Sequence, residues 1–112
     1  MNIVIAGAGD VGYHLAELLA QESQNITLID RDEDVLEMVS NRLDVLTICG
    51  DCASPEILQS AGVKKANLFL AVTTSEKTNL ISSILAKKMG ATKTVARVQN
   101  QEYIEKNTKS NF

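Results

Sequence analysis

Three glycines near the start of the chain, Gly7, Gly9 and Gly12, form the pattern G-x-G-x-x-G between a short apolar run and a segment with helical periodicity. Glycine lets the backbone turn tightly and approach a ligand, and a helix that begins there directs unpaired N–H groups at an anion. The residue types and their spacing therefore indicate a site for a phosphate-bearing ligand. The candidate site also includes the residues between the glycines, Ala8, Asp10 and Val11.

An acidic residue, Asp30, follows Gly12 by 18 residues and stands at the end of the second apolar run. A glycine motif alone is a weak signal, but one that follows a strand, opens a helix and precedes such a carboxylate indicates dinucleotide or adenine-nucleotide binding. The carboxylate would accept hydrogen bonds from the ribose hydroxyls and repel a 2′-phosphate, which favours NAD over NADP. Arg31 could reach a phosphate, or it could be a solvated residue before a helix.

Two further candidates, Asp51 and Cys52, follow the third apolar run. Asp51 could accept a hydrogen bond from an adenine amino group or serve as a turn residue. Cys52 forms a C-x-x-C pair with Cys49, a spacing found in thiol redox and metal sites. No second such pair or histidine cluster accompanies it, so we expect no metal site. The simpler interpretation makes Cys49 a small core residue and Cys52 a loop residue.

The stretch AVTTSEKTNL places polar side chains where a fourth strand should end and a helix begin. Thr73 and Glu76 match a capping box, in which the glutamate reaches back to the N-cap amide. The same helix start would point at a ligand crevice, so the hydroxyls of Thr73 and Thr74, and Asn79, are candidate ligand contacts. Arg97, near the end of the fifth apolar run, is a lone cation suited to a bidentate phosphate contact.

These candidates require a scaffold that brings several loops together. Short apolar runs alternate with helix-period segments along the chain, which predicts βαβ units around a parallel sheet. The predicted strands cover residues 2–6, 26–29, 45–49, 68–72 and 94–98, and their continuous apolar character predicts burial on both faces. Right-handed crossovers then give a single Rossmann-like α/β domain. Its doubly wound parallel sheet has the order 3-2-1-4-5, with helices on both faces and a crevice where strands 1 and 4 diverge.

Three helix-period segments carry apolar residues that we expect to pack on this sheet. These residues are Val11, Leu15, Leu18 and Leu19, then Val35, Leu36, Val39 and Leu43, and last Leu80, Ile81, Ile84 and Leu85. A short helix is expected between the third and fourth strands. Ser54 would be its N-cap, Pro55 its first residue and Gly62 its C-terminal cap.

Composition and charge exclude several function classes. The 112 residues carry a formal net charge of −3 without a run of Lys or Arg, so nucleic acid is not an expected partner. No apolar stretch reaches the roughly 18 residues that span a bilayer, so we expect no direct membrane insertion and a cytoplasmic location. Catalysis is not expected, because the single His14 lies behind the glycine loop. Tyr103 and Lys106 lack the spacing of short-chain dehydrogenases and should lie on a last helix.

Five ordered motifs resemble those of a known family. They are MNIVIAGAGDVGYHLAELL, ITLIDRDE, LDVLTICGDCASPEIL, AGVKKANLFLAVTTSEKTNL and ARVQNQEY. Together they are similar to the regulatory nucleotide-binding domain, also called the KTN or RCK N-terminal domain, of Trk and Ktr potassium uptake systems. The resemblance implies that the three glycines hold phosphates, Asp30 holds ribose, Asp51 lies near adenine and Arg97 approaches a phosphate. Gln99 departs from the arginine that is frequent at its position in the family.

The resemblance implies a regulatory binding domain rather than an enzyme. Bound nucleotide, NAD(H) first and ATP or ADP as the other choice, would shift the arrangement of neighbouring copies and so control a membrane potassium transporter subunit. A homodimer or higher assembly at the inner face of the membrane is implied. Residues 1–112 are expected to be one domain of a longer regulator. The alternative is the cofactor-binding portion of an NAD-dependent oxidoreductase.

Overall fold

A parallel five-stranded sheet of order β3-β2-β1-β4-β5 forms the centre of the computed structural model, which describes residues 1–99. The strands are β1 (Asn2–Ala6), β2 (Asn25–Asp30), β3 (Leu46–Cys49), β4 (Leu68–Ala71) and β5 (Lys93–Ala96). The predicted fold class and strand order are therefore confirmed. Tyr103 and Lys106, with the last helix predicted for them, lie outside the described residues.

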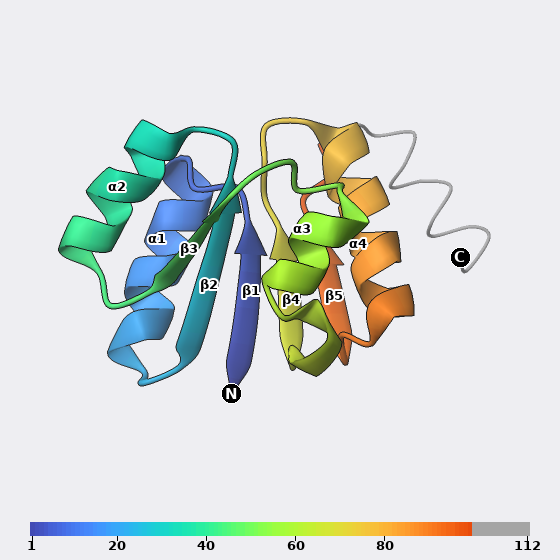
Figure 1. The fold of residues 1–112 in the computed structure, drawn as a ribbon, viewed down its shortest axis with the longest axis horizontal. Helices are drawn as coiled ribbons and strands as arrows, with labels where there is room; N and C mark the ends of the chain where they lie inside the picture. Colours follow the sequence, from blue (N-terminus) through green and yellow to red (C-terminus); the bar gives the residue numbers. More distant parts are fainter. Residues whose placement is uncertain (100–112) are drawn as a thin grey trace.

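Helices cover both faces of the sheet. They are α1 (Asp10–Gln21), α2 (Glu33–Arg42), α3 (Pro55–Ser60), the 3-10 helix η1 (Val63–Lys65) and α4 (Glu76–Met89). Figure 1 shows α1 and α2 on one side of the sheet and α3 and α4 on the other. The chain leaves β1 and β4 toward opposite faces, which opens a crevice at the carboxyl ends of these neighbouring strands. Within residues 1–99, no helix has both the length and the apolar character needed to cross a bilayer.

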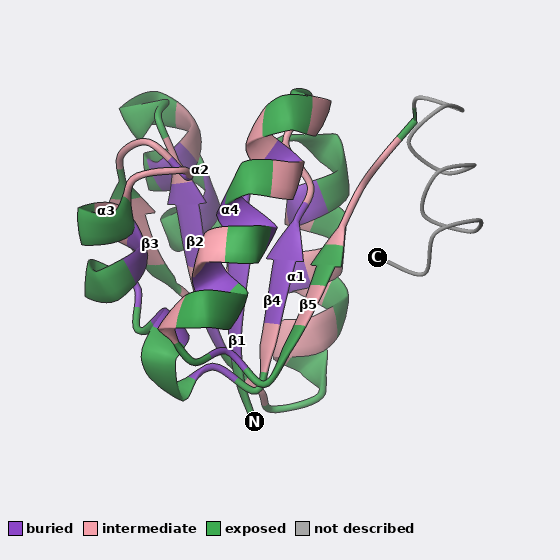
Figure 2. Ribbon diagram, turned by 90° about the vertical axis from the view of Figure 1, so that its right-hand side faces the viewer, coloured by how far each residue is buried: buried purple, intermediate pink, exposed green. Residues whose placement is uncertain are grey.

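The three central strands are buried on both faces, as their apolar sequences predict. Ile3 and Ile5 of β1 pack with the side chains of α1 and α2, whereas Val4 packs with the cluster beneath α3 and α4. The same expectation is wrong for the edge strands β3 and β5, which Figure 2 colours largely as intermediate (pink) and exposed (green). Leu46 of β3 is 70% exposed and Val95 of β5 is 44% exposed. An edge strand has a neighbour on one side only, and the described helices leave part of its surface open.

The apolar residues of α1 and α2 divide between core and surface. In α2 the predicted stripe packs into the core, with Leu36 and Val39 fully buried. In α1, Leu15 and Leu19 pack against the core, but Val11 and Leu18 are exposed. The residues that α1 buries fully are Gly12 and Ala16. Small residues on this face let α1 lie close to the sheet, and the larger side chains flank the contact.

Two of the four apolar residues of α4 that we expected to pack on the sheet are exposed instead. Ile81 and Ile84 are 51% and 57% exposed, although Leu85 packs against the core. The residues buried on α4 are Asn79, Ser82, Ser83 and Ala86. Asn79 forms hydrogen bonds with Thr73 and Arg97, which follow β4 and β5, and these bonds fix the rotation of this helix about its axis. That rotation turns Ile81 and Ile84 outward.

Helix caps were predicted correctly for α3 and incorrectly for α4. The Ser54 hydroxyl accepts from the Ile57 amide, Pro55 opens α3, and Gly62 follows the helix in the left-handed conformation with φ of +81°. In α4 the N-cap is Ser75, whose hydroxyl accepts from the Thr78 amide. The predicted capping box of Thr73 and Glu76 is therefore absent.

Both residues of that predicted box make other contacts. The Thr73 hydroxyl accepts from the Ser75 amide, and Glu76 Oε1 accepts from the Gln99 amide at 2.7 Å. Glu76 thus links the start of α4 to the chain that leaves β5. The amide of the N-cap Ser75 already donates to the Thr73 hydroxyl, and the Glu76 carboxylate accepts from Gln99 instead.

Candidate functional site

A crevice of about 740 Å³ lies at the carboxyl ends of the strands, where the sequence places the candidate residues. Its walls come from the loops that follow all five strands. The predicted residues that line it are Gly7, Gly9, Asp10, Val11, Asp30, Arg31, Asp51, Cys52, Thr73, Thr74 and Arg97. Three predicted residues, Ala8, Gly12 and Asn79, lie behind the wall and are buried. Three others, Val72, Ser75 and Thr78, line the crevice but were not predicted.

The glycine loop is shaped by backbone contacts that exclude side chains. Gly7 has φ of +105°, and a Cβ on it would lie 3.0 Å from the Thr73 backbone. A Cβ on Gly12 would overlap the carbonyl oxygen of Gly7. Gly9, in contrast, would place a Cβ in open space, and as N-cap of α1 it offers no side-chain cap. The N-terminus of α1 thus faces the crevice without a capping side chain, an arrangement that fits a phosphate group.

Asp30 ties the glycine loop to the loop that follows β2. Its Oδ2 accepts from the Ala8 amide and its Oδ1 accepts from the Asp32 amide, both at 2.8 Å. A carboxylate has about four lone-pair positions, so each oxygen can still accept a ribose hydroxyl. Asp30 is therefore held in one orientation and remains available at the crevice.

Asp51 and Arg31 form an ion pair at the rim of the crevice, with Arg31 Nη2 and Asp51 Oδ2 3.0 Å apart. The other oxygen of Asp51 accepts from the Ala53 amide at 2.9 Å, which is the geometry of a turn residue. The hydrogen bond from Ala53 lowers the pKa of Asp51, desolvation opposes this shift, and the hydrogen bond and charge of Arg31 lower the pKa further, so that it lies below its ordinary value. Asp51 is thus an ionised turn residue that also engages Arg31, and its contact with an adenine amino group stays a prediction.

At the other end of the crevice, Asn79 connects the ends of β4 and β5. Its Oδ1 accepts from the Thr73 amide at 2.9 Å and from the Thr73 hydroxyl at 2.7 Å. Its Nδ2 donates to the carbonyl oxygens of Thr73 and Arg97 at 3.1 and 3.0 Å. Asn79 is only 1% exposed, so it positions these two residues instead of lining the crevice itself.

Cys49 ends β3 and Cys52 lies in the loop after it, as predicted, but the burial expected of Cys49 belongs to Cys52 instead. Cys52 is buried and its thiol donates to the Ile29 carbonyl, whereas Cys49 is exposed and donates to the Arg31 carbonyl. Burial raises the pKa of Cys52 to about 11, and the carboxylates of Asp30 and Asp51 contribute in the same direction. Since thiol redox chemistry requires a thiolate, this buried thiol gives no support to a redox role. Residues 1–99 contain no His, Cys, Asp and Glu group that could hold a metal ion.

The three unpredicted lining residues gave only weak sequence signals. Val72 follows β4 and was counted as strand, and it also packs against the core beneath α1. Ser75 and Thr78 face the crevice because α4 begins at Glu76, two residues later than a Thr73 cap would allow. A predicted N-cap at Ser75 would have indicated that both side chains lie at the crevice.

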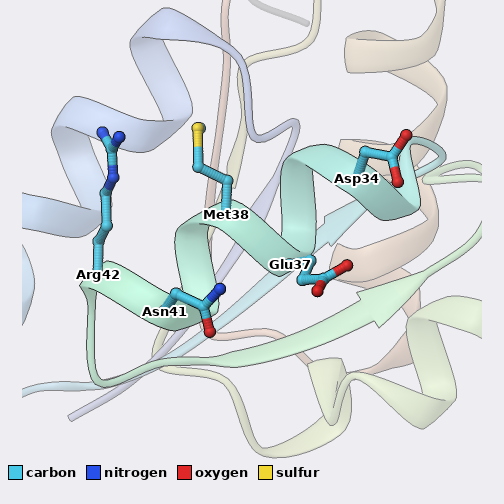
Figure 3. A pocket seen from close by; sticks show the side chains of 5 residues that line it. All are labelled: Asp34, Glu37, Met38, Asn41 and Arg42. Carbon is cyan, nitrogen blue, oxygen red and sulfur yellow. The ribbon is translucent and has the colours of Figure 1, made fainter.

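A second, shallower depression of about 400 Å³ lies on the outer side of α2, shown in Figure 3. Its lining residues are Asp34, Glu37, Met38, Asn41 and Arg42. All five belong to one helix, and no group from another loop or strand converges on them. This surface lacks the convergent polar groups that characterise a ligand site.

The fold and the crevice define a Rossmann-like domain with the glycine loop, helix terminus and strand-end carboxylate at which this class binds nucleotides. Sequence comparison then gives the particular family. Residues 3–111 match the TrkA-N domain, and the chain belongs to that family.

Relatives of known name are potassium uptake proteins. A Trk system potassium uptake protein TrkA homolog from Archaeoglobus fulgidus is 47% identical over 106 residues, covering 95% of this chain and 24% of the relative. The TrkA protein of Halomonas elongata is 40% identical over 105 residues, covering 93% of this chain and 23% of the relative. The chain thus spans about a quarter of the length of these relatives.

Solved structures with the same fold include a Kef C-terminal domain and reductases. The Kef C-terminal domain of Shewanella denitrificans, solved in an AMP-bound form, matches with a TM-score of 0.82 at 21% identity over 99% of this chain and 67% of that one. The Escherichia coli reductase ChuY matches with a TM-score of 0.65 at 19% identity over 84% of this chain and 48% of that one. At these identities the likeness shows the fold alone.

Alanine substitutions distinguish Gly12, where packing leaves no room for a side chain, from Gly9, where a side chain has free space. Because a Cβ on Gly12 overlaps a backbone oxygen, we expect Gly12→Ala to lower the free energy of unfolding by about 1–3 kcal/mol. Gly9 has an ordinary φ of −73° and free space around the added Cβ, so Gly9→Ala should change it by less than about 1 kcal/mol. Urea unfolding of both variants measures the difference. Equal losses would show that Gly9 is also needed for packing.

Proposed function

We propose that this domain binds an adenine nucleotide, NAD(H) or ATP/ADP, and acts as the nucleotide-sensing part of a potassium uptake regulator. The observation that carries the proposal is the Asp30 carboxylate, which is fixed by two backbone amides beside an uncapped helix N-terminus. These two features are the ribose and phosphate subsites of a dinucleotide fold. Membership of the TrkA-N family supports the link to potassium uptake.

Each part of the ligand has matching groups in the crevice. The ribose hydroxyls would donate to Asp30, and the phosphates would lie over Gly9 and the first amides of α1. Arg97, held by the backbone contact with Asn79, would approach a phosphate from the opposite wall. Both a pyrophosphate and a triphosphate suit this arrangement. The AMP bound to the Kef relative supports an adenine nucleotide without selecting between NAD and ATP.

Regulation requires that the ligand distinguish two arrangements of the protein. A nucleotide can shift an assembly only through its differential affinity for the two states, typically worth about 1–3 kcal/mol. Ligand groups here would contact loops from both halves of the sheet, so closure of the crevice around the ligand would supply that difference in affinity. The partner would be a membrane potassium transporter subunit at the cytoplasmic face, with this domain bound peripherally. No nucleic acid is expected to take part.

The alternative is the cofactor-binding portion of an oxidoreductase, and the reductases among the structures of the same fold favour it. Hydride transfer usually needs a proton donor or acceptor beside the substrate. Among the described residues, the crevice is lined by no histidine, lysine or tyrosine, and His14 lies exposed on α1 outside it. We therefore favour binding without catalysis.

Titration of the Asp30→Ala and Asp30→Asn variants tests the proposed ligand contact. Loss of a hydrogen bond to a charged group costs about 1.5–3 kcal/mol, so Asp30→Ala should weaken NADH or ATP binding by roughly 10- to 150-fold. Asp30→Asn keeps one acceptor oxygen and should lose less. Isothermal titration calorimetry measures each affinity, and NADPH should bind more weakly than NADH to the unmodified chain.

The exposed Asp44, at the amino end of β3, provides the matched control. Asp44→Ala removes the same charge at the opposite end of the strands from the crevice and should leave the affinities unchanged. Equal losses in both variants, or NADPH binding as tight as NADH, would contradict the role of Asp30. Turnover of NADH by the purified chain would instead support the oxidoreductase.

We also propose that the domain works as a homodimer or higher assembly, because transmission of a signal requires a neighbour that moves. Light scattering should give a mass of at least twice the 12.1 kDa of one chain. A mass of one chain, with and without nucleotide, would contradict self-association of this domain.

A further inference from the structure

The ion pair between Arg31 and Asp51 joins two loops at the end of the crevice that contains Asp30. Arg31 is the next residue after Asp30, and Asp51 follows β3, the strand paired with β2. Cys49 is the partner of Asp30 in the register of the two strands, so both loops begin at the same level of the sheet. The pair therefore stands beside the position at which Asp30 would hold a ribose.

Further hydrogen bonds position both partners of the ion pair. The Ala53 amide occupies Asp51 Oδ1 and leaves Oδ2 for Arg31 Nη2. The backbone of Arg31 is fixed by the Cys49 thiol, which donates to its carbonyl at 3.4 Å, and the neighbouring Asp30 carbonyl accepts from the Gly50 amide at 2.9 Å. The Arg31 side chain is 77% exposed, so solvent and ligands can reach it.

An arginine in the loop after the second strand is the group that accommodates the 2′-phosphate of NADP in dinucleotide-binding folds. Here the arginine is present but faces a carboxylate. We propose that Asp51 is a specificity-determining residue, which engages Arg31 and thereby excludes adenosine ligands that carry a 2′-phosphate. This inference rests on the proposed function, since it requires that an adenosine ribose bind at Asp30.

Charge explains how the exclusion works. Asp30 and Asp51 together outweigh the single positive charge of Arg31, so a doubly charged phosphate at the ribose 2′ position meets net repulsion. Removing the charge of Asp51 balances the remaining two groups and frees the guanidinium fork to bind phosphate in a bidentate way. Removing Arg31 instead leaves two carboxylates and strengthens the exclusion. Tolerance for the 2′-phosphate should therefore be highest without the charge of Asp51, intermediate in the unmodified chain and lowest without Arg31.

The Asp51→Asn variant isolates this charge. Asparagine keeps the side-chain oxygen that accepts from the Ala53 amide, so the turn is preserved while the ion pair is lost. Thermal unfolding checks that the variant is folded. Asp44→Asn, an equal change of charge at the amino end of β3, controls for the overall electrostatic effect.

The experiment uses two ligands that differ only in the 2′-phosphate, 5′-AMP and adenosine 2′,5′-bisphosphate. Calorimetry gives the ratio of their dissociation constants for the unmodified 112-residue chain and for each variant. We expect Asp51→Asn to shift the ratio about tenfold toward the bisphosphate, an effect that weakens in high salt. Arg31→Ala should shift it the other way, Asp44→Asn should leave it unchanged, and the Arg31→Ala, Asp51→Asn double variant should lose the gain.

An unchanged ratio in Asp51→Asn, with 5′-AMP still bound, would overturn this inference and leave the proposed function standing. A gain that persists in the double variant would also overturn it, because the phosphate would then not be bound by Arg31. Failure of 5′-AMP to bind the unmodified chain would overturn the proposed function and this inference together.

Discussion

The two hydrogen bonds that Asp30 accepts from the Ala8 and Asp32 amides are the constraint on which the site depends. They fix the glycine loop against β2, and they hold a charged acceptor at the crevice without help from a ligand. Asn79 does the corresponding work on the other wall, where it joins the ends of β4 and β5. The buried side-chain amide of Asn79 and the half-buried carboxylate of Asp30 thus connect loops that the sheet alone would leave independent. The crevice is preformed by these two side chains.

The fold could be predicted because the signal for it is local. Continuous apolar runs separated by helix-period segments admit few arrangements once crossovers must be right-handed, and the sheet order followed. Exposure on the sheet edges and on α4 could not be predicted in this way. Periodicity shows that a helix has an apolar face, but the rotation of α4 depends on hydrogen bonds of Asn79 to Thr73, which precedes the helix, and to Arg97, which follows β5. Ile81 and Ile84 are exposed for that reason.

The candidate site likewise contains residues that local sequence predicts and contacts that depend on distant segments. The glycines and Asp30 were found because a strand, a turn and a helix are adjacent in sequence and impose a fixed spacing. The pairing of Arg31 with Asp51 could not be found, because it depends on how two loops 20 residues apart approach each other across β2 and β3. The places of Cys49 at the end of β3 and of Cys52 in the following loop could be predicted, but their burial could not, because β3 is an edge strand and the loop after it packs into the core.

The central claim is that the strand-end crevice, and no other surface of the described residues, receives an adenine nucleotide. Nuclear magnetic resonance of the ¹⁵N-labelled chain titrated with 5′-AMP, the part that NAD and ATP share, tests it most directly. We predict that the largest amide shifts fall on the glycine loop, on Asp32, whose amide reports on Asp30, and on Arg97, with Met38 and Asn41 on the outer side of α2 unmoved. Shifts centred on α2, or no shifts at millimolar ligand, would contradict the account.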